Sequence, residues 1–334
     1  MVFWKRNIFL ILISLLVGAG IFIWFGRVVG WDHVWQAFEV FKGWQGIVIL
    51  ALTFLIAIIG NWRWYEILKD KQVDVSFRKI FDSYLGGYAM MYLFPIIFLS
   101  GEIFRIFSLV KEEKIQISKA ASSVIIERIL EWTINILVIL FGLFFLFSRL
   151  NLPIQVLYIF GTALVFFIGS IGFFYFKALS QKSIVSGLIK KIVHKEIAKS
   201  NNILEIENEV LIFFQPGSKP LIKGLILSLL RAGVMLARVW LLIIFLGGIG
   251  VDFIISLSIL GFSYFSALVP IPTSLGAHEI IQVAAFNAFH LESSMVTAFT
   301  MIIRGAEIIV SILGLGFLLK KGFSIVEEKF YPVK

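Results

Sequence analysis

The sequence predicts an all-helical integral membrane protein with about six full membrane spans and two broken, re-entrant helical hairpins related as inverted repeats. Three observations lead to this prediction. The 334-residue chain is 59% hydrophobic, with a mean hydropathy of +0.96, whereas soluble domains are about 45–50% apolar. Several apolar runs reach about 20 residues, the length that crosses a bilayer. Two stretches of the chain also share one layout of prolines, glycines and charged residues.

Composition argues against several classes of function. The chain has no cysteine, which excludes disulfides, thiol catalysis and thiolate metal sites. Its four histidines are scattered and form no ligand pattern, so we predict no metal and no cofactor. The net charge of +9 comes largely from lysines in loops between apolar runs, so we predict no nucleic-acid partner. No hydrophilic stretch is long enough for a separate soluble domain, and residues 1–334 are expected to form one membrane domain.

The full spans are assigned to long apolar runs in chain order. Span 1 is expected over about 7–28. This run lacks a small-residue cleavage site, so we interpret it as a membrane span rather than as a removed signal peptide. Spans 2 to 6 are expected over about 46–68, 118–147, 153–176, 221–246 and 294–319. At the end of span 2, Trp62, Trp64 and Tyr65 surround Arg63, a pattern that favours an interfacial aromatic belt with a snorkelling arginine.

Two pairs of shorter apolar runs lie between these spans, at about 81–94 with 100–110 and at about 252–269 with 274–289. A helix of about 14 residues reaches roughly 21 Å, which is too short to cross comfortably. Pro95 breaks the first pair, and Pro270 and Pro272 break the second. Broken backbone at membrane depth is tolerated where protein or a wet cavity surrounds it. We therefore predict two re-entrant hairpins, although the second pair is also long enough for two full crossings.

One extended polar stretch forms a linker over about 178–219. Within it, Ile184, Leu188 and Ile192 recur every four residues among several lysines. This spacing predicts a basic amphipathic helix on an anionic cytoplasmic leaflet, and a solvated linker helix is the alternative.

Lysine and arginine are distributed unequally across this topology. With a cytoplasmic N-terminus, 21 of them fall inside and three outside, as the positive-inside rule requires. We therefore expect a multi-pass protein of the cell (inner or plasma) membrane with both termini cytoplasmic. The two hairpins then open from opposite sides, which makes repeat 1 (about 81–148) and repeat 2 (about 252–319) inverted copies, a design typical of transporters.

The repeats place charged residues within apolar sequence at matching positions. Arg128-x-x-Glu131 follows Pro95 in the first, and Arg304-x-x-Glu307 follows Pro270 in the second; the proline-to-arginine separation is 33 residues in one and 34 in the other. A charge in a bilayer costs about 2.5–3.5 kcal/mol on insertion scales and therefore faces protein or water. Pairing three residues apart on one helix would explain these charges structurally, but not their repetition beside two helix breaks.

We predict that the two repeats form a lipid head-group site near the midplane. The charged and polar residues expected to bind the head group are Glu102, Arg105, Arg128, Glu131, His278, Glu279, Arg304 and Glu307. The residues expected to break helices or to offer backbone N–H groups are Pro95, Ser100, Gly101, Pro270, Pro272, Thr273, Ser274 and Gly276. Helix starts carry partial positive charge and attract anions. No catalytic residue is assigned.

These motifs resemble the lysylphosphatidylglycerol synthase transmembrane region, also described as a flippase-like membrane protein family. The family includes the flippase part of the multiple peptide resistance factor. The resemblance covers about residues 8 to 320 and is carried by Tyr84-Leu85-Gly86-Gly87-Tyr88, Pro95, Gly101-Glu102-x-x-Arg105, Glu127-Arg128, Pro270-x-Pro272, Gly276-x-x-Glu279 and Arg304. The chain departs at Ser100-Gly101-Glu102, where a Gly-Gly-Asp type sequence is common, and at Ala277-His278. Because it lacks an aminoacyl-transferase domain, we do not expect it to synthesise lysyl lipid.

The resemblance implies a flippase that moves a phospholipid, an aminoacyl-phospholipid or a polyprenyl-phosphate-linked lipid between leaflets by alternating access. The expected partner is a lipid with an anionic or zwitterionic head group, and a homo-oligomer is left open. Two other hypotheses remain: a membrane accessory protein or transferase in isoprenoid-linked glycan or lipid modification, and an ion-coupled small-solute carrier. No glycine-rich phosphate loop or Ser/His/Asp grouping stands out, so we expect a transporter rather than an enzyme.

Overall fold

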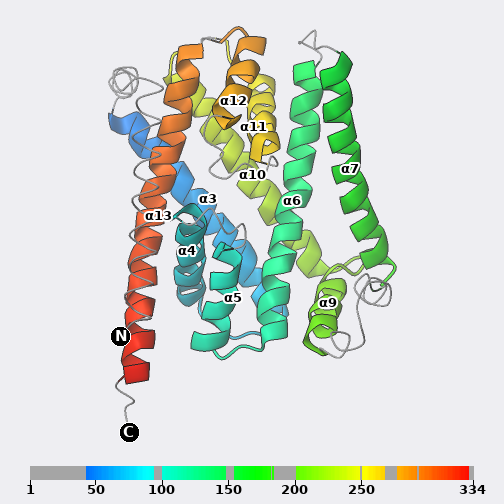
Figure 1. Cartoon of the computed structure of the whole chain (residues 1–334), viewed down its shortest axis with the longest axis vertical. Helices are drawn as coiled ribbons and strands as arrows, with labels where there is room; N and C mark the ends of the chain where they lie inside the picture. Colours follow the sequence, from blue (N-terminus) through cyan, green and yellow to red (C-terminus); the bar gives the residue numbers. More distant parts are fainter. Residues whose placement is uncertain are drawn as a thin grey trace.

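The computed structural model of the protein describes residues 43–93, 100–147, 154–181, 183, 201–248, 250–267, 277–291 and 293–330. Within these ranges the regular structure is entirely helical (Figure 1), which confirms the all-helical prediction. Three of the described helical segments are long and apolar enough to cross a membrane: Gly43–Asp70, Lys219–Phe245 and Ala298–Phe317. Predicted span 1, the helix expected around 184–195, and Pro95, Pro270, Pro272, Thr273, Ser274 and Gly276 lie outside the described residues.

The helices follow the predicted apolar runs closely. They are α3 (Gly43–Asp70), α4 (Phe77–Leu93), α5 (Ser100–Glu112), α6 (Ile117–Phe147), α7 (Ile154–Leu179), α9 (Asn201–Phe213), α10 (Lys219–Phe245), α11 (Phe253–Ala267), α12 (Ala277–Ala288) and α13 (Ser293–Phe330). The last helix extends beyond the expected end of span 6 at 319. The described parts of both predicted hairpins are pairs of short helices, α4 with α5 and α11 with α12.

One helix, α9, lies in the stretch that the sequence analysis treated as a linker. It packs on α6, and Val210, Leu211 and Phe213 are buried in a cluster with Leu130 of α6 and Ala178 of α7. Its apolar residues therefore anchor this polar stretch to the helical body.

At the centre of the fold, α3 and α10 lie side by side and run in opposite directions (Figure 1); we call their line of contact the α3–α10 crossing. The two helices pack closely against each other. At the start of α10, the Ser218 hydroxyl accepts a hydrogen bond from the Leu221 backbone N–H at 3.4 Å, which caps the helix. In Figure 1, α13 stands on one side of this crossing and α6 and α7 stand on the other.

The two pairs of short helices occupy opposite ends of the molecule. In Figure 1, α4 and α5 lie in the lower half, and α11 and α12 lie in the upper half. Each pair rests on the long helix that follows the other pair, because α4 packs along α13 and α11 packs along α6.

Glycines permit the close contact between α6 and α11. A Cβ atom added to Gly142 of α6 would lie 2.8 Å from the carbonyl oxygen of Leu257, and one added to Gly261 of α11 would lie 2.9 Å from that of Val138. Small residues at such positions let helix backbones approach closely, as is common in membrane bundles.

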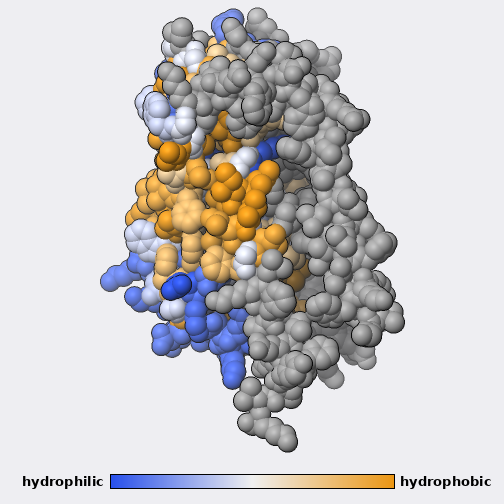
Figure 2. Space-filling view, turned by 90° about the vertical axis from the view of Figure 1, so that its left-hand side faces the viewer, coloured by the Kyte–Doolittle hydropathy of each residue, from blue (hydrophilic) through white to orange (hydrophobic). Residues whose placement is uncertain are grey.

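The surface has the character of a membrane protein. Large apolar side chains point outward from several helices; Phe144 of α6, Phe166 of α7 and Leu229 of α10 are each more than 60% exposed. Figure 2 shows an apolar band across the middle of the described surface and hydrophilic residues gathered at its lower end. A soluble protein rarely exposes so much contiguous apolar surface, so this arrangement agrees with a multi-pass membrane protein.

Candidate functional site

Arg63, near the end of α3, is buried in the protein interior. The interpretation of this residue as a snorkelling arginine is wrong, because its side chain is only 1% exposed. Its Nη1 donates to Ser228 Oγ of α10 at 2.9 Å, and its Nη2 pairs with Glu127 and, at 3.2 Å, with Glu131 Oε2, both on α6. A buried charge requires partners of this kind, and here they come from two other helices.

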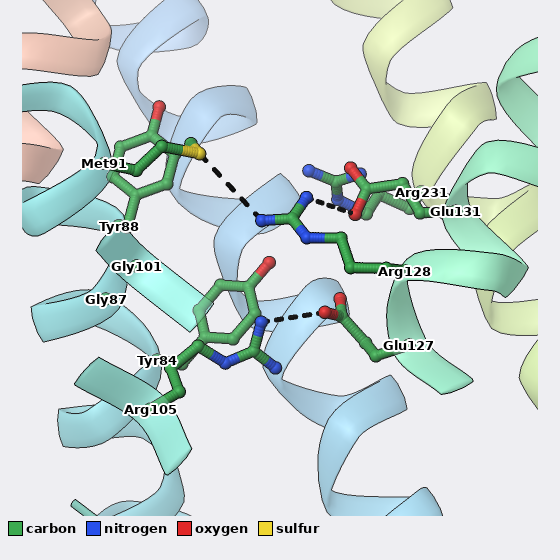
Figure 3. Close-up of a pocket in the computed structure, with 10 residues that line it drawn as sticks. All are labelled: Tyr84, Gly87, Tyr88, Met91, Gly101, Arg105, Glu127, Arg128, Glu131 and Arg231. Atoms are coloured by element: carbon green, nitrogen blue, oxygen red, sulfur yellow. Dashed lines mark hydrogen bonds and ion pairs between the residues drawn. The ribbon is translucent and has the colours of Figure 1, made fainter. Parts of the chain in front are cut away.

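Arg63 belongs to a set of seven charged residues joined by ion pairs, which we call the large network. Its members come from α3, α5, α6 and α10: Arg63, Glu102, Arg105, Glu127, Arg128, Glu131 and Arg231. Figure 3 shows five of them around one cavity. Four of the predicted head-group residues, Glu102, Arg105, Arg128 and Glu131, are therefore brought together by the fold.

On α5, Arg105 is held from two sides. Its Nη1 donates to Glu127 Oε2 at 2.8 Å. The centre of its guanidinium lies 3.9 Å from the centroid of the Trp64 ring and 4.9 Å from that of Tyr84. Such cation–π contacts are strongest when the groups are shielded from water, and Arg105 is 4% exposed. The aromatic residues of α3 and α4 therefore fix the arginine beside the cavity.

Glu131 is the residue through which three arginines meet. It accepts from Arg128 Nη1 at 3.2 Å, from Arg231 Nη1 at 2.6 Å and from Arg63 Nη2. The intrahelical pair between Arg128 and Glu131 therefore exists, but it is one part of a larger arrangement. Arg128 also pairs with Glu102 of α5, and its side chain is 32% exposed, far more than the 1% of Glu127.

The cavity beside the network has a volume of about 50 Å³. Its walls are formed by Tyr84, Gly87, Tyr88, Met91, Gly101, Arg105, Glu127, Arg128, Glu131 and Arg231 (Figure 3). Gly87 of α4 and Gly101 of α5 let these two helices touch, since a Cβ atom on Gly87 would lie 2.8 Å from the Gly101 carbonyl oxygen. This close approach places Gly101 and Arg105 at the cavity wall.

A second, smaller network joins α3, α10 and α13. Arg238 of α10 is buried, donates from Nη1 to Thr53 Oγ1 of α3 at 3.1 Å, and pairs through Nη2 with Glu307 Oε1 of α13 at 3.3 Å. We call Thr53, Arg238 and Glu307 the small network.

The two networks contain one shared arrangement. An offset of 175 positions relates Thr53 to Ser228 and Arg63 to Arg238. Arg63 of α3 thus binds the hydroxyl of α10, while Arg238 of α10 binds the corresponding hydroxyl of α3. In each case a glutamate of the long helix that follows, Glu131 or Glu307, accepts from the same arginine.

The other predicted site residues are placed separately. Arg304 is half-buried on α13. His278 and Glu279 lie on the first turn of α12, where the side chains are not among those described. Ser100 begins α5, and its hydroxyl donates to the Met90 carbonyl oxygen at 3.2 Å.

Sequence reasoning missed several members of the networks. Arg231 and Arg238 lie within predicted span 5 but were not assigned to the site, and Thr53 and Ser228 were not considered. One signal was available, because the offset between Arg63 and Arg238 equals the offset between Pro95 and Pro270.

The match to a known protein family covers the residues of both networks. The model of the family described as the lysylphosphatidylglycerol synthase TM region matches residues 11–314. The chain is similar to a UPF0104 membrane protein of Methanocaldococcus jannaschii, with 26% identity over 269 residues that cover 77% of this chain and 79% of that protein. No solved structure matches the chain.

Proposed function

The chain belongs to the lysylphosphatidylglycerol synthase transmembrane-region family, and on that premise we propose that it is a lipid flippase that transfers a phospholipid or polyprenyl-phosphate-linked lipid between leaflets. One observation carries this proposal: a buried network of arginines and glutamates lines a cavity inside a membrane protein. Charged groups at membrane depth typically mark a substrate or ion pathway.

The surroundings of the cavity suit an amphipathic substrate. Arg128, at the cavity wall, is 32% exposed, so the cavity reaches the outer surface of the bundle there. Neighbouring positions on α4, α5 and α6 expose apolar side chains, since Met91, Ile103 and Ile125 are 37%, 57% and 41% exposed. A head group enters the network from this side, while the acyl chains remain along the apolar outer surface.

We further propose that the two halves are inverted repeats that open alternately. The reciprocal contacts across the α3–α10 crossing support this proposal, as does the packing of each short helix pair on the long helix of the other half. The short pairs lie at opposite ends of the molecule (Figure 1), as expected for hairpins that enter from opposite sides. In this cycle the large network holds the bundle closed in one state, and the small network holds it closed in the other.

The proposed orientation in the membrane rests on the positive charges at one end of the helical bundle, which we call the polar end. Lys71, Lys79 and Lys119 lie in or beside the loops that connect α3 with α4 and α5 with α6. By the positive-inside rule this end faces the cytoplasm, and both termini are then cytoplasmic in a cell membrane.

A leaflet-exchange assay tests the proposed function. Full-length protein is reconstituted into liposomes that contain head-group-labelled phosphatidylglycerol, lysyl-phosphatidylglycerol or a polyprenyl phosphate, and an impermeant quencher reports the outer leaflet. We expect the wild-type protein to exchange at least one of these lipids. Arg128→Ala should lower the exchange rate about tenfold, because it removes a wall of the site. Arg304→Ala tests the second repeat in the same way.

The matched control is Lys79→Gln, which removes one positive charge from an exposed ion pair with Glu113 at the polar end and is expected to exchange lipid at the wild-type rate. Exchange unaffected by Arg128→Ala and Arg304→Ala, or no exchange of any of the three lipids by folded protein, would contradict the proposal.

A further inference from the structure

The large network holds more positive than negative charge. It joins four arginines to three glutamates through ion pairs among the described residues, so one positive charge is left over when all seven are ionised. Most of the network is shielded from solvent, because Arg63, Arg105 and Glu127 are 4% exposed or less, and Arg128, at 32%, is its most exposed member. An uncompensated charge in such a place is strongly unfavourable, and an anion in the cavity relieves it.

Several arginine donors beside the cavity have no hydrogen-bond partner within the described part of the chain. They are Nε of Arg128 and of Arg231, and Nε and Nη2 of Arg105. All three side chains line the cavity (Figure 3). Buried polar groups without partners are rare in folded proteins, and arginine forks match the oxygens of a phosphate group.

The cavity is small. Its volume of about 50 Å³ gives room for a group the size of a few water molecules. A phosphate group is of this size, whereas a head group extended by an esterified amino acid is much larger. The lysine of such a head group would also bring positive charge to a network that already has an excess.

We infer that the large network is a site for one phosphate group with a single negative charge, the charge state of a lipid phosphodiester, and that it disfavours cationic head groups. The lipid source rests on the proposed function; a soluble phosphate ester offers the same chemistry. Among lipids, the order of affinity is phosphatidylglycerol first, then the zwitterionic phosphatidylcholine, and then lysyl-phosphatidylglycerol.

Equilibrium binding to the full-length protein in a neutral detergent tests the inference without requiring transport. The probes are the three lipids above, with inorganic phosphate and glycerol phosphate as soluble arms. We expect phosphatidylglycerol to bind about tenfold tighter than either other lipid, as one close charge contact typically confers. Equally tight binding of glycerol phosphate would support the phosphate site and assign its ligand to the aqueous phase. Equal affinity for all three lipids, or a preference for the lysyl lipid, would overturn the inference.

Two variants change the surplus charge in opposite directions. Arg231→Gln balances the network at three arginines and three glutamates, and we expect it to reduce the preference for phosphatidylglycerol to near unity. Glu102→Gln raises the surplus to two positive charges. We expect it to raise the ratio of the affinity for the more highly charged phosphatidate to that for phosphatidylglycerol about tenfold relative to wild type. Lys79→Gln makes the same charge change as Arg231→Gln but at the polar end, and it should leave the preference unchanged.

If Arg231→Gln fails to fold, Glu102→Gln still decides the inference. Preferences that do not move with the charge of the network would refute it even if the protein exchanges lipid. Charge-dependent preferences in a protein that exchanges no lipid would refute the proposed function and leave the inference standing.

Discussion

The two halves of the chain surround corresponding arginines in different ways. Arg63 lies in the large network, while the corresponding Arg238 binds one hydroxyl and one glutamate among the described residues. Both arginines bridge α3 and α10, and both contact a glutamate on the long helix that follows. The shared part of the arrangement therefore supports the crossing of the helices.

The difference between the halves identifies which charges have no counterpart at the corresponding positions of the other half. The offset of 176 that relates Arg128 to Arg304 places Ile303 where the first half has Glu127. The offset of 175 similarly places Ile280 opposite Arg105 and Ile56 opposite Arg231. Because α3, α12 and α13 form with isoleucine at these positions, we attribute Arg105, Glu127 and Arg231 to the proposed function rather than to helix formation.

The largest effect is expected from removing the central carboxylate of the large network. Glu127→Leu leaves Arg63 and Arg105 without their shared partner, and we expect it to lower the free energy of unfolding by about 3–5 kcal/mol. Ile303→Leu, at the corresponding position of the second half, should cost less than about 1.5 kcal/mol. Denaturant-induced unfolding in detergent measures both, and similar losses would show that the halves do not differ in this respect.

A smaller difference is expected between the two corresponding arginines. Arg63→Gln removes pairs to Glu127, which is 1% exposed, and to Glu131, which is 14% exposed, and should cost about 3 kcal/mol. Arg238→Gln removes the hydrogen bond to Thr53 and one pair to Glu307, whose side chain is 25% exposed, and should cost about 2 kcal/mol because solvent weakens that pair. The same unfolding measurement applies. A larger loss for Arg238→Gln than for Arg63→Gln would reverse the comparison and make the small network the main support of the crossing.

The long apolar helices could be predicted from the sequence, but the contacts between them could not. Long apolar runs define α3, α6 and α10 because few polar residues interrupt them, and glycine and charge spacing indicated the pair at Arg128 and Glu131. Arg63 was misread because its neighbours Trp62, Trp64 and Tyr65 are typical of an interfacial belt, whereas its ionic partners on α6 are more than 60 positions away.

Two other features depend on tertiary packing in the same way. The helix α9 was missed because it lies within the polar stretch at about 178–219, and only packing on α6 and α7 reveals that Val210 and Phe213 are core residues. Thr53 and Ser228 are ordinary helix residues in sequence, and only the crossing of α3 and α10 makes them ligands of arginine.

The smallest effect should be shared equally by the two halves. Thr53→Val and Ser228→Ala each remove the hydroxyl that accepts from a buried arginine at the crossing, and each should cost about 1.5 kcal/mol, the lower end for a hydrogen bond to a charged group. Because the two contacts involve different arginines, the double variant should show additive losses within about 0.5 kcal/mol. If the two costs differ severalfold, only one of the two contacts stabilises the packing of α3 on α10. The two halves would then correspond in sequence but not in the stability that these contacts provide.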